Sequence, residues 1–95
     1  MAYDRLFFRV HAIERMFEKS IAEVEVRDVL ENGEIIDEDR SDPPRIKRLH
    51  LGRPGGRVIH VVATDDPVEE VTTIITVYEP KLDRWEPGFR RRKTR

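Results

Sequence analysis

The side chains best suited to chemistry in this sequence are histidine, tyrosine and arginine, since the chain has three His and no Cys. His11 and Arg15 stand four residues apart, which places both on one side of a helix. An imidazole can transfer a proton while a guanidinium binds an anion through two N–H donors, so the pair is typical of a phosphate-binding site. The spacing also fits an exposed helix face with ordinary charge pairing, because Glu18 falls on the same side.

A second set of polar side chains falls on predicted strands in the second half of the chain. Thr76 and Tyr78 alternate along one strand, and strand parity predicts that they share the open sheet face with His60 and Arg48. Metal-free RNA cleavage needs a base for the 2′-hydroxyl, an acid for the leaving oxygen and cations for the phosphorane. The alternative is that these residues have no catalytic role and lie on the solvent-exposed face of a half-buried sheet. The candidate catalytic residues are His11, Arg15, His60 and Tyr78, and the candidate substrate-binding residues include Arg48 and Thr76.

A metal site is a further possibility, because His50 and His60 are predicted to be neighbours across two strands. Zinc requires a third ligand with matching geometry, and nothing in the sequence supplies one at a defined place. We therefore expect no metal and no cofactor. The sequence also lacks a phosphate-cradling glycine motif, a G-x-S-x-G turn and a cysteine nucleophile, which excludes the enzyme classes that depend on them.

The distribution of charge points to an anionic partner. Residues 81–95 hold seven Lys or Arg and two Asp or Glu, whereas the whole chain has a net charge of −1. A basic carboxyl-terminal segment on an otherwise acidic chain suggests contact with phosphate or with an acidic protein surface. The candidate substrate-binding residues in this segment are Arg90, Arg91 and Arg92. A solvated chain end is the alternative. We predict one domain over residues 1–89 and a basic tail over residues 90–95, which either is free or folds back along a sheet edge.

Length and composition limit the class of protein. The 95 residues fit one small domain, and 38% are apolar and 39% charged. No apolar run approaches the ~20 residues of a membrane span, and the first five residues lack the apolar core of a signal peptide. We therefore expect a soluble cytoplasmic protein.

The first third of the chain has helical patterns. An apolar stripe predicts a helix over residues 11–19, and a second stripe predicts another that begins at Ser20. Ser20 and Glu23 have the spacing of a capping box, and Asn32-Gly33 suits a left-handed helix stop. The predicted core positions are Ala12, Ile13, Met16, Phe17, Ala22, Val26, Val29 and Leu30.

After Gly33 the pattern predicts strands over residues 34–38, 45–51, 57–64 and 71–78. Pro54-Gly55-Gly56 suits a three-residue hairpin loop, which would pair His50 with His60 and turn Leu49, Leu51, Ile59, Val61 and Ala63 toward the core. In the last strand the predicted apolar face is Val71, Thr73, Ile75 and Val77. The predicted fold is α+β, with two amino-terminal helices packed on one face of a four-stranded, mostly antiparallel sheet.

Several segments together resemble a known family. His11-Ala12-Ile13-Glu14-Arg15-Met16 and Ile75-Thr76-Val77-Tyr78-Glu79-Pro80 are similar to the H-A-x-x-R-M and I-T-V-Y-x-P motifs of an uncharacterised family of small prokaryotic domains. The resemblance extends from about residue 9 to 92, although Arg9 stands where a Ser or Thr often caps the first helix. That family is similar to the RelE, ParE and BrnT toxins. The resemblance implies a RelE-like or BrnT-like fold, an endoribonuclease activity, a small antitoxin protein as partner, and motif positions at His11, Arg15, Thr76 and Tyr78.

Three classes of function remain open from the sequence. The first is a metal-independent endoribonuclease of the toxin–antitoxin type. The second is a non-catalytic module that binds RNA or a protein through the basic tail. The third is a small structural or regulatory domain. The net charge of −1 argues against binding of nucleic acid regardless of sequence, since affinity for the phosphate backbone grows with the number of phosphates that the protein neutralises.

Overall fold

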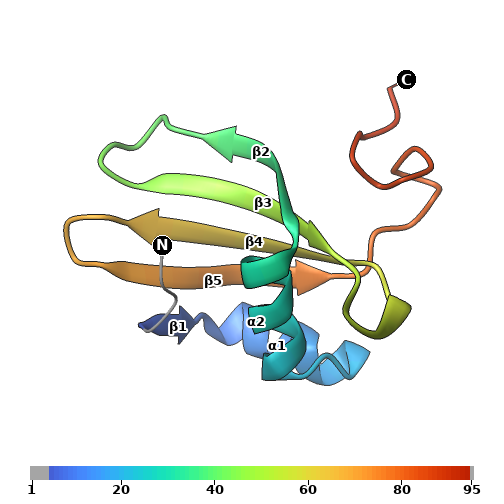
Figure 1. Cartoon of the computed structure of the whole chain (residues 1–95), viewed down its shortest axis with the longest axis horizontal. Coiled ribbons are helices and arrows are strands. Elements are labelled where there is room, and N and C mark those ends of the chain that lie inside the picture. The colour runs from blue at the N-terminus through green and yellow to red at the C-terminus, as the bar shows by residue number, and fades with distance from the viewer. Residues whose placement is uncertain (1–4, 95) are drawn as a thin grey trace.

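The computed structural model describes residues 5–94, in which two helices lie on one face of a five-stranded sheet (Figure 1). Residues 1–4, on which the expectation about a signal peptide depends, lie outside the described residues. So does Arg95, the last residue of the predicted tail. The α+β class is confirmed. The strand order is β1-β5-β4-β3-β2, with bounds β1 Leu6–Phe8, β2 Glu34–Asp39, β3 Ile46–Gly52, β4 Ile59–Asp66 and β5 Val71–Tyr78.

The strand that the sequence pattern did not predict is β1, so the count of four strands is wrong. It pairs in parallel with β5, Leu6 opposite Thr72, whereas every other pair is antiparallel. Three residues are too short for a clear alternation of polar and apolar side chains. Their pairing with β5 depends on contacts distant in the sequence.

Helix α1 (Val10–Lys19) confirms the first predicted helix, but the junction with α2 (Glu23–Asn32) differs from the prediction. Ser20 ends α1 in a left-handed conformation with φ 53°, so it cannot have the extended backbone of an N-cap. The predicted capping box is therefore wrong. Ala22 is the N-cap of α2, and the Glu25 carboxylate accepts a hydrogen bond from the Ala22 amide at 2.9 Å.

Arg57, which precedes β4, holds the two helices at this junction. Its guanidinium donates to the carbonyl oxygens of Lys19 at 3.0 Å and Ser20 at 2.9 Å, which are exposed acceptors at the end of α1. The same guanidinium pairs with Glu25 at 3.0 Å. The bond from the Ala22 amide, with Arg57 in addition, lowers the pKa of Glu25. One cation thus stabilises the end of α1 and the start of α2.

The predicted left-handed stop at Gly33 is also wrong, because its backbone is extended, with φ −80° and ψ −173°. Glycine is needed there for space. A Cβ at this position would lie 2.4 Å from the carbonyl oxygens of both Val29 and Leu51. Gly33 therefore lets the chain leave α2 and enter β2 against the backbone of β3.

Helix α1 packs on β5, whereas α2 packs on β3 and β4. The core lies between these helices and the sheet; its buried residues are Ala12, Ile21, Val26, Val29, Leu30, Ile59, Val61, Ala63, Ile74 and Val77. Three of the predicted core positions are exposed, namely Ile13 (46%), Phe17 (86%) and Ala22. The apolar side of α1 is wider than the strip that the sheet covers.

The predicted register of the β3–β4 hairpin is wrong by one residue. His50 lies opposite Val61 and Leu51 opposite His60, so His50 and His60 point to opposite faces of the sheet. The connection is longer than three residues, because pairing stops at Gly52 and Ile59 and a short 3₁₀ turn over Pro54–Gly56 fills the gap. Leu49 and Leu51 therefore lie on the face away from the helices, although Leu51 is only 3% exposed.

A β-bulge in β5 changes which of its residues face the helices. Val62 pairs with Thr76 and Ala63 pairs with Ile74, which leaves Ile75 as the extra residue. The buried side is therefore Val77 with Ile74 and Thr72, and the predicted apolar face through Ile75 and Thr73 is wrong. Beyond the bulge, the prediction that Thr76 and Tyr78 share a face with His60 is confirmed.

Candidate functional site

The chain after β5 packs against the end of the sheet face that carries no helix. Residues 79–94, which we name the C-terminal segment, leave β5 and turn back on themselves (Figure 1). Trp85 pairs with Arg92 in an antiparallel bridge, and the amide of Lys93 donates to the carbonyl of Arg84 at 2.9 Å. Positive φ angles at Gly88 (92°) and Phe89 (62°) make the reversal between these pairs.

Three contacts attach this segment to the sheet. The Trp85 ring, which is 5% exposed, meets the His60 ring edge-on with centroids 4.5 Å apart. The carbonyl oxygen of Phe89 lies 2.9 Å from His60 Nε2. Arg90 forms an ion pair with Glu34 of β2 at 2.6 Å. Of the two arrangements that the sequence left open for the basic tail, the described part has the folded-back one.

The protonation of His60 follows from its two hydrogen bonds. A carbonyl oxygen can only accept, so Nε2 carries the proton and donates to Phe89. Nδ1 is then the acceptor, and the Tyr78 hydroxyl, 3.2 Å away, donates to it. His60 is fully buried, so no solute reaches the imidazole directly.

The electrostatics keep both members of this pair neutral. Burial lowers the pKa of His60, the bond to Phe89 acts in the opposite direction, and Arg92 lowers it further. Burial raises the pKa of Tyr78, and Arg92 acts against that rise. The proton therefore rests on the Tyr78 oxygen at neutral pH, with the lone pair of His60 Nδ1 facing it.

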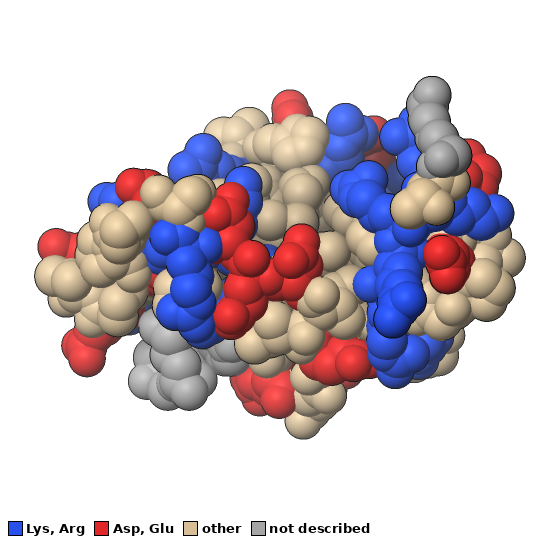
Figure 2. Space-filling view, turned by 90° about the horizontal axis from the view of Figure 1, so that it is seen from above, with Lys and Arg blue, Asp and Glu red and all other residues tan. Residues whose placement is uncertain are grey.

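Tyr78 lines a groove of about 780 Å³ between α1 and the C-terminal segment. Five cationic side chains line it against two acidic ones, Glu79 and Asp83. The cations are Arg15, Lys19, Lys81, Arg84 and Arg92. Figure 2 shows Lys and Arg gathered over this end of the molecule, on the side of the C-terminal segment. We name this feature the basic groove.

Most of the positive charge in the basic groove is not neutralised by an acidic neighbour. Arg15 pairs with Glu18 at 3.0 Å, and Arg92 lies over the Trp85 ring at 4.9 Å. Within residues 5–94, no carboxylate forms an ion pair with Lys19, Lys81 or Arg84. An anion such as an RNA phosphate would supply the missing counter-charge.

The structure brings together only some of the residues singled out from the sequence. Arg15, Tyr78 and Arg92 line the basic groove, and Thr76 lies on the same sheet face as Tyr78. His11 is exposed on α1, more than one turn before Lys19, and does not line the groove. Arg90 is held by Glu34, and Arg91 is exposed.

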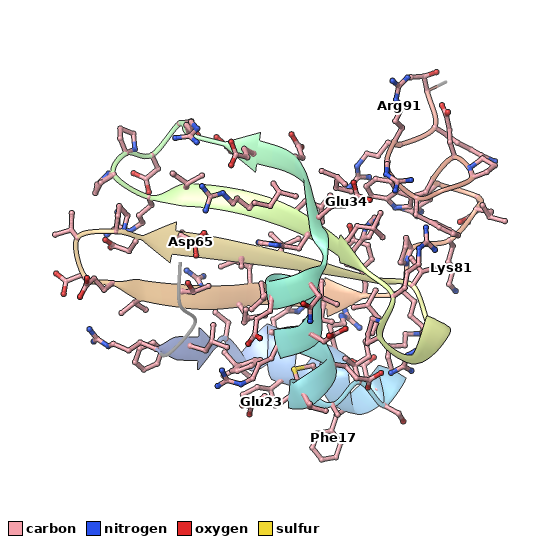
Figure 3. The ribbon with its side chains drawn as sticks, in the orientation of Figure 1. Phe17, Glu23, Glu34, Asp65, Lys81 and Arg91 are labelled. Carbon is pink, nitrogen blue, oxygen red and sulfur yellow. The ribbon has the colours of Figure 1, made fainter. Side chains whose placement is uncertain are left out.

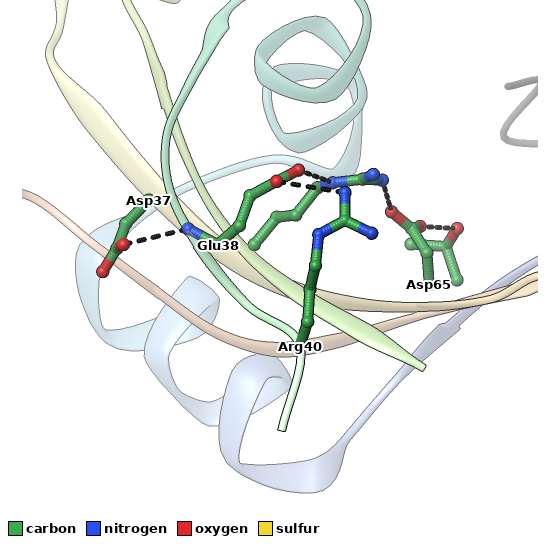
Figure 4. Close-up of polar contacts among 6 residues, drawn as sticks. Asp37, Glu38, Arg40 and Asp65 are labelled. Carbon is green, nitrogen blue, oxygen red and sulfur yellow. Dashed lines mark hydrogen bonds and ion pairs between the residues drawn. The ribbon is translucent and has the colours of Figure 1, made fainter. Parts of the chain in front are cut away.

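Arg48 lies on the other face of the sheet, so its predicted position beside His60 is wrong. It pairs with Ala63, whose side chain is in the core under the helices. The Arg48 guanidinium binds Glu38 at 2.7 Å and Asp65 at 2.5 Å. Figure 4 shows this row of polar side chains, in which Arg40 also contacts Glu38. The bond to Glu38 is the main cause that raises the pKa of Arg48.

The predicted site residues do not include Lys19, Lys81, Arg84 and Trp85, which line the groove. The excess of positive charge over residues 81–95 includes Lys81 and Arg84 as well as the run of arginines at its end, but the sequence does not indicate which of these side chains line a groove. Lys81 and Arg84 line the groove, whereas Arg90 and Arg91 do not.

The two buried histidines cannot share a metal ion, because they lie on opposite faces of the sheet. His50 faces the helices, is 1% exposed, and has no hydrogen-bond partner for Nε2 among the described residues. Burial lowers its pKa, Asp65 opposes this effect and Arg48 reinforces it. Within residues 5–94 no three His, Asp or Glu side chains come together in a way that could hold a metal.

Comparison with known proteins identifies a family. None of the curated proteins and none of the solved structures matches the chain. Among the described residues, no helix has the length and apolar character needed to cross a membrane. One family model matches residues 8–79. The matched range includes both helices and all five strands except the first two residues of β1. It ends before Lys81, Arg84 and Trp85 of the basic groove. The chain therefore belongs to the family described as Domain of unknown function (DUF4258).

Proposed function

We propose that this protein binds single-stranded RNA in the basic groove and cleaves it without a metal ion, as an endoribonuclease of the toxin–antitoxin type. The observation that carries the proposal is the position of Tyr78. Tyr78 lines a groove with five cations, and its hydroxyl is hydrogen-bonded to a buried, neutral histidine. A phosphate in the groove would lie near both a group that can accept a proton and charges that stabilise a phosphorane.

The proposed reaction uses the 2′-hydroxyl of the RNA as nucleophile. Its oxygen bonds to phosphorus while the bond from phosphorus to the 5′-oxygen of the next nucleotide breaks. The 2′ proton passes to the Tyr78 oxygen, and the Tyr78 proton passes to Nδ1 of His60, which becomes a cation. Water in the open groove protonates the leaving oxygen, and the hydroxide that remains takes a proton from Tyr78, which recovers its own from Nδ1 of His60. The products are a 2′,3′-cyclic phosphate and a 5′-hydroxyl.

The roles of the four candidate catalytic residues change accordingly. Tyr78 contacts the substrate, and Arg15 neutralises the developing charge together with Lys81, Arg84 and Arg92. His60 is a positioning residue that also takes the proton through Tyr78, because it has no exposed atom. His11 has no role in this scheme, since it does not line the groove.

The second candidate function is non-catalytic binding of RNA or of an acidic protein segment in the same groove. It is favoured by two observations: no histidine is among the described residues that line the groove, and burial raises the pKa of Tyr78, so that little phenolate is available there to accept a proton at neutral pH. A small antitoxin protein remains the predicted protein partner for either function.

A cleavage assay separates the two functions. The purified protein is incubated with a labelled single-stranded RNA in the presence of a chelator, with and without ribosomes, and the product ends are identified. Cleavage with 2′,3′-cyclic phosphate ends supports the endoribonuclease, and a substrate with 2′-deoxyribose must resist cleavage. Binding without cleavage supports the module, and neither binding nor cleavage contradicts both.

Salt dependence tests whether the basic groove is the place of binding. Each phosphate neutralised on a single strand contributes a slope of about −0.7 to the dependence of log affinity on log salt concentration. Arg84→Gln should reduce the slope by about that amount. The matched control is Arg91→Gln, because Arg91 belongs to the same segment but does not line the groove. Equal slopes for both variants would place the RNA elsewhere.

A further inference from the structure

The outer side of α1 carries an apolar surface that nothing in residues 5–94 covers. Val10 is 72% exposed, Ile13 46% and Phe17 86%. These positions follow the i, i+3, i+7 spacing of one helical stripe. Figure 3 shows the Phe17 ring projecting away from the sheet at the edge of the molecule. Isolated apolar side chains on a surface are ordinary, but a continuous stripe of this kind marks an interaction site.

The stripe borders a hollow rather than a flat surface. A groove of about 580 Å³ runs between α1 and the start of α2, with Phe8, Met16 and Ile21 among its lining residues and Ile13 and Phe17 on its wall. It lies apart from the basic groove, with which it shares no lining residue. From Val10 to Phe17 the stripe extends about 10 Å along the helix, which is the length of two turns of a partner helix.

The charge around this surface selects among possible occupants. Glu23 is the one charged residue among the described residues that line this groove. Arg15 and Arg27 are already paired with Glu18 and Glu23, and no described cation pairs with Glu14, which adjoins the stripe. A second copy of this chain would bring two acidic rims together, and an anionic lipid surface would be repelled.

From the apolar stripe, the groove and the acidic rim, we propose that this surface binds an amphipathic helix of a partner protein, with apolar side chains on one face and Lys or Arg beside them. Apolar anchors one turn apart enter the groove next to Ile13 and Phe17, and the basic side chains meet Glu14 and Glu23. This interaction is separate from the proposed RNA function and holds whether or not the basic groove binds RNA.

Two designed peptides test the proposal. Both are helices of about four turns with the same spacing of Leu residues; one has Lys at the remaining positions and the other has Glu. Binding to the full chain is measured by fluorescence anisotropy. We expect the Lys peptide to bind at least about tenfold more tightly than the Glu peptide, and Phe17→Ser to weaken that binding by about tenfold or more. The control is Leu82→Ser, because Leu82 is 53% exposed and lies on the C-terminal segment.

Phe17 is so exposed that its replacement should leave the fold intact, which a melting curve checks. Equal binding of the Lys peptide by wild type and Phe17→Ser, or equal binding of the two peptides, would overturn the proposal. Sedimentation tests the second copy: a dimer that Phe17→Ser dissociates would assign the surface to self-association instead. Capture by anionic vesicles that Phe17→Ser abolishes would assign it to a membrane.

Discussion

The Tyr78 hydroxyl donates a hydrogen bond to Nδ1 of His60 across the β4–β5 pair, at 3.2 Å. This direction is imposed by the other side of the ring, where Nε2 must donate to the carbonyl of Phe89. The C-terminal segment thus determines the tautomer of a buried histidine, and the histidine determines the orientation of a tyrosine in the basic groove. A surface turn and a candidate reacting group are coupled through one imidazole.

Exchange of Tyr78 for Phe should separate catalysis from binding. In the proposed reaction, Tyr78→Phe removes the group that accepts the 2′ proton and should slow RNA cleavage by about 10²–10⁴-fold. RNA affinity should change little, because the cations that contact phosphate remain. The comparison variant is His11→Ala, which should keep full activity since His11 lies outside the groove. Full activity of Tyr78→Phe, measured as initial cleavage rate, would remove Tyr78 from the mechanism.

Acid should destabilise the fold through the buried histidines. Burial lowers the pKa of both His50 and His60 below the ordinary value near 6.5, so the unfolded chain binds more protons than the native one just below that pH. The free energy of unfolding therefore rises with pH through this range. The contribution of the two neutral histidines to it is lost as the pH falls from about 6.5 toward their lower native pKa values.

Urea titrations at pH 7 and pH 5 measure this effect. His60→Gln and His50→Gln should each show a smaller difference in unfolding free energy between the two pH values than wild type. His11→Gln is the control, because His11 is exposed on α1. The lowered pKa values of Glu25, Glu38 and Asp39 place their titration below this window. A pH dependence in His60→Gln equal to that of wild type would show that His60 is not the group responsible.

Removal of residues 90–95 should lower the melting temperature, contrary to what a free basic tail would give. The deletion removes the Trp85–Arg92 bridge, the Lys93 amide bond and the Arg90–Glu34 ion pair, and it exposes Trp85. Two lost backbone hydrogen bonds alone contribute about 1–3 kcal/mol, which corresponds to several degrees in a domain of this size.

A matched pair of point variants tests the same segment with less disturbance. Arg92→Ala removes the guanidinium over the Trp85 ring and should cost about 0.5–1 kcal/mol. Arg91→Ala should cost less, because the Arg91 side chain is exposed and only its carbonyl is bonded. Thermal unfolding followed by Trp85 fluorescence measures both. An unchanged midpoint in the deletion variant would mean that these contacts do not stabilise the fold.

A methyl group at position 33 should be costly. The Cβ of Gly33→Ala would lie 2.4 Å from two carbonyl oxygens, so α2 must move away from β3. We expect a loss of about 3 kcal/mol or more in unfolding free energy, because two backbone oxygens must move. Gly55→Ala is the control: its Cβ meets nothing within 4 Å, so only the strain of its φ of 61° remains. Equal costs for the two variants would contradict a close approach at Gly33.

The sequence by itself determined the local elements. The stripe over residues 11–19 gives α1, the β-branched run over residues 71–78 gives β5 to the residue, and the prolines at 43 and 44 mark the break between β2 and β3. These features depend on the backbone preferences and periodicity of neighbouring residues, which are present in any window of the chain. The excess of Lys and Arg over residues 81–95 is likewise visible without a structure.

Only the tertiary structure decided which side of each element is buried. The alternation of side chains predicts Leu51 on the helix side, which holds only if one face of the sheet is covered. Trp85 and Phe89 cover part of the other face, so apolar residues are buried on both faces. One extra residue at Ile75 and a longer turn after Gly52 then determine the register, and with it the separation of His60 from His50 and of Tyr78 from Arg48. Periodicity specifies that one side of a strand differs from the other, but the side that becomes the core depends on the segments that pack against it, and these come from distant parts of the chain.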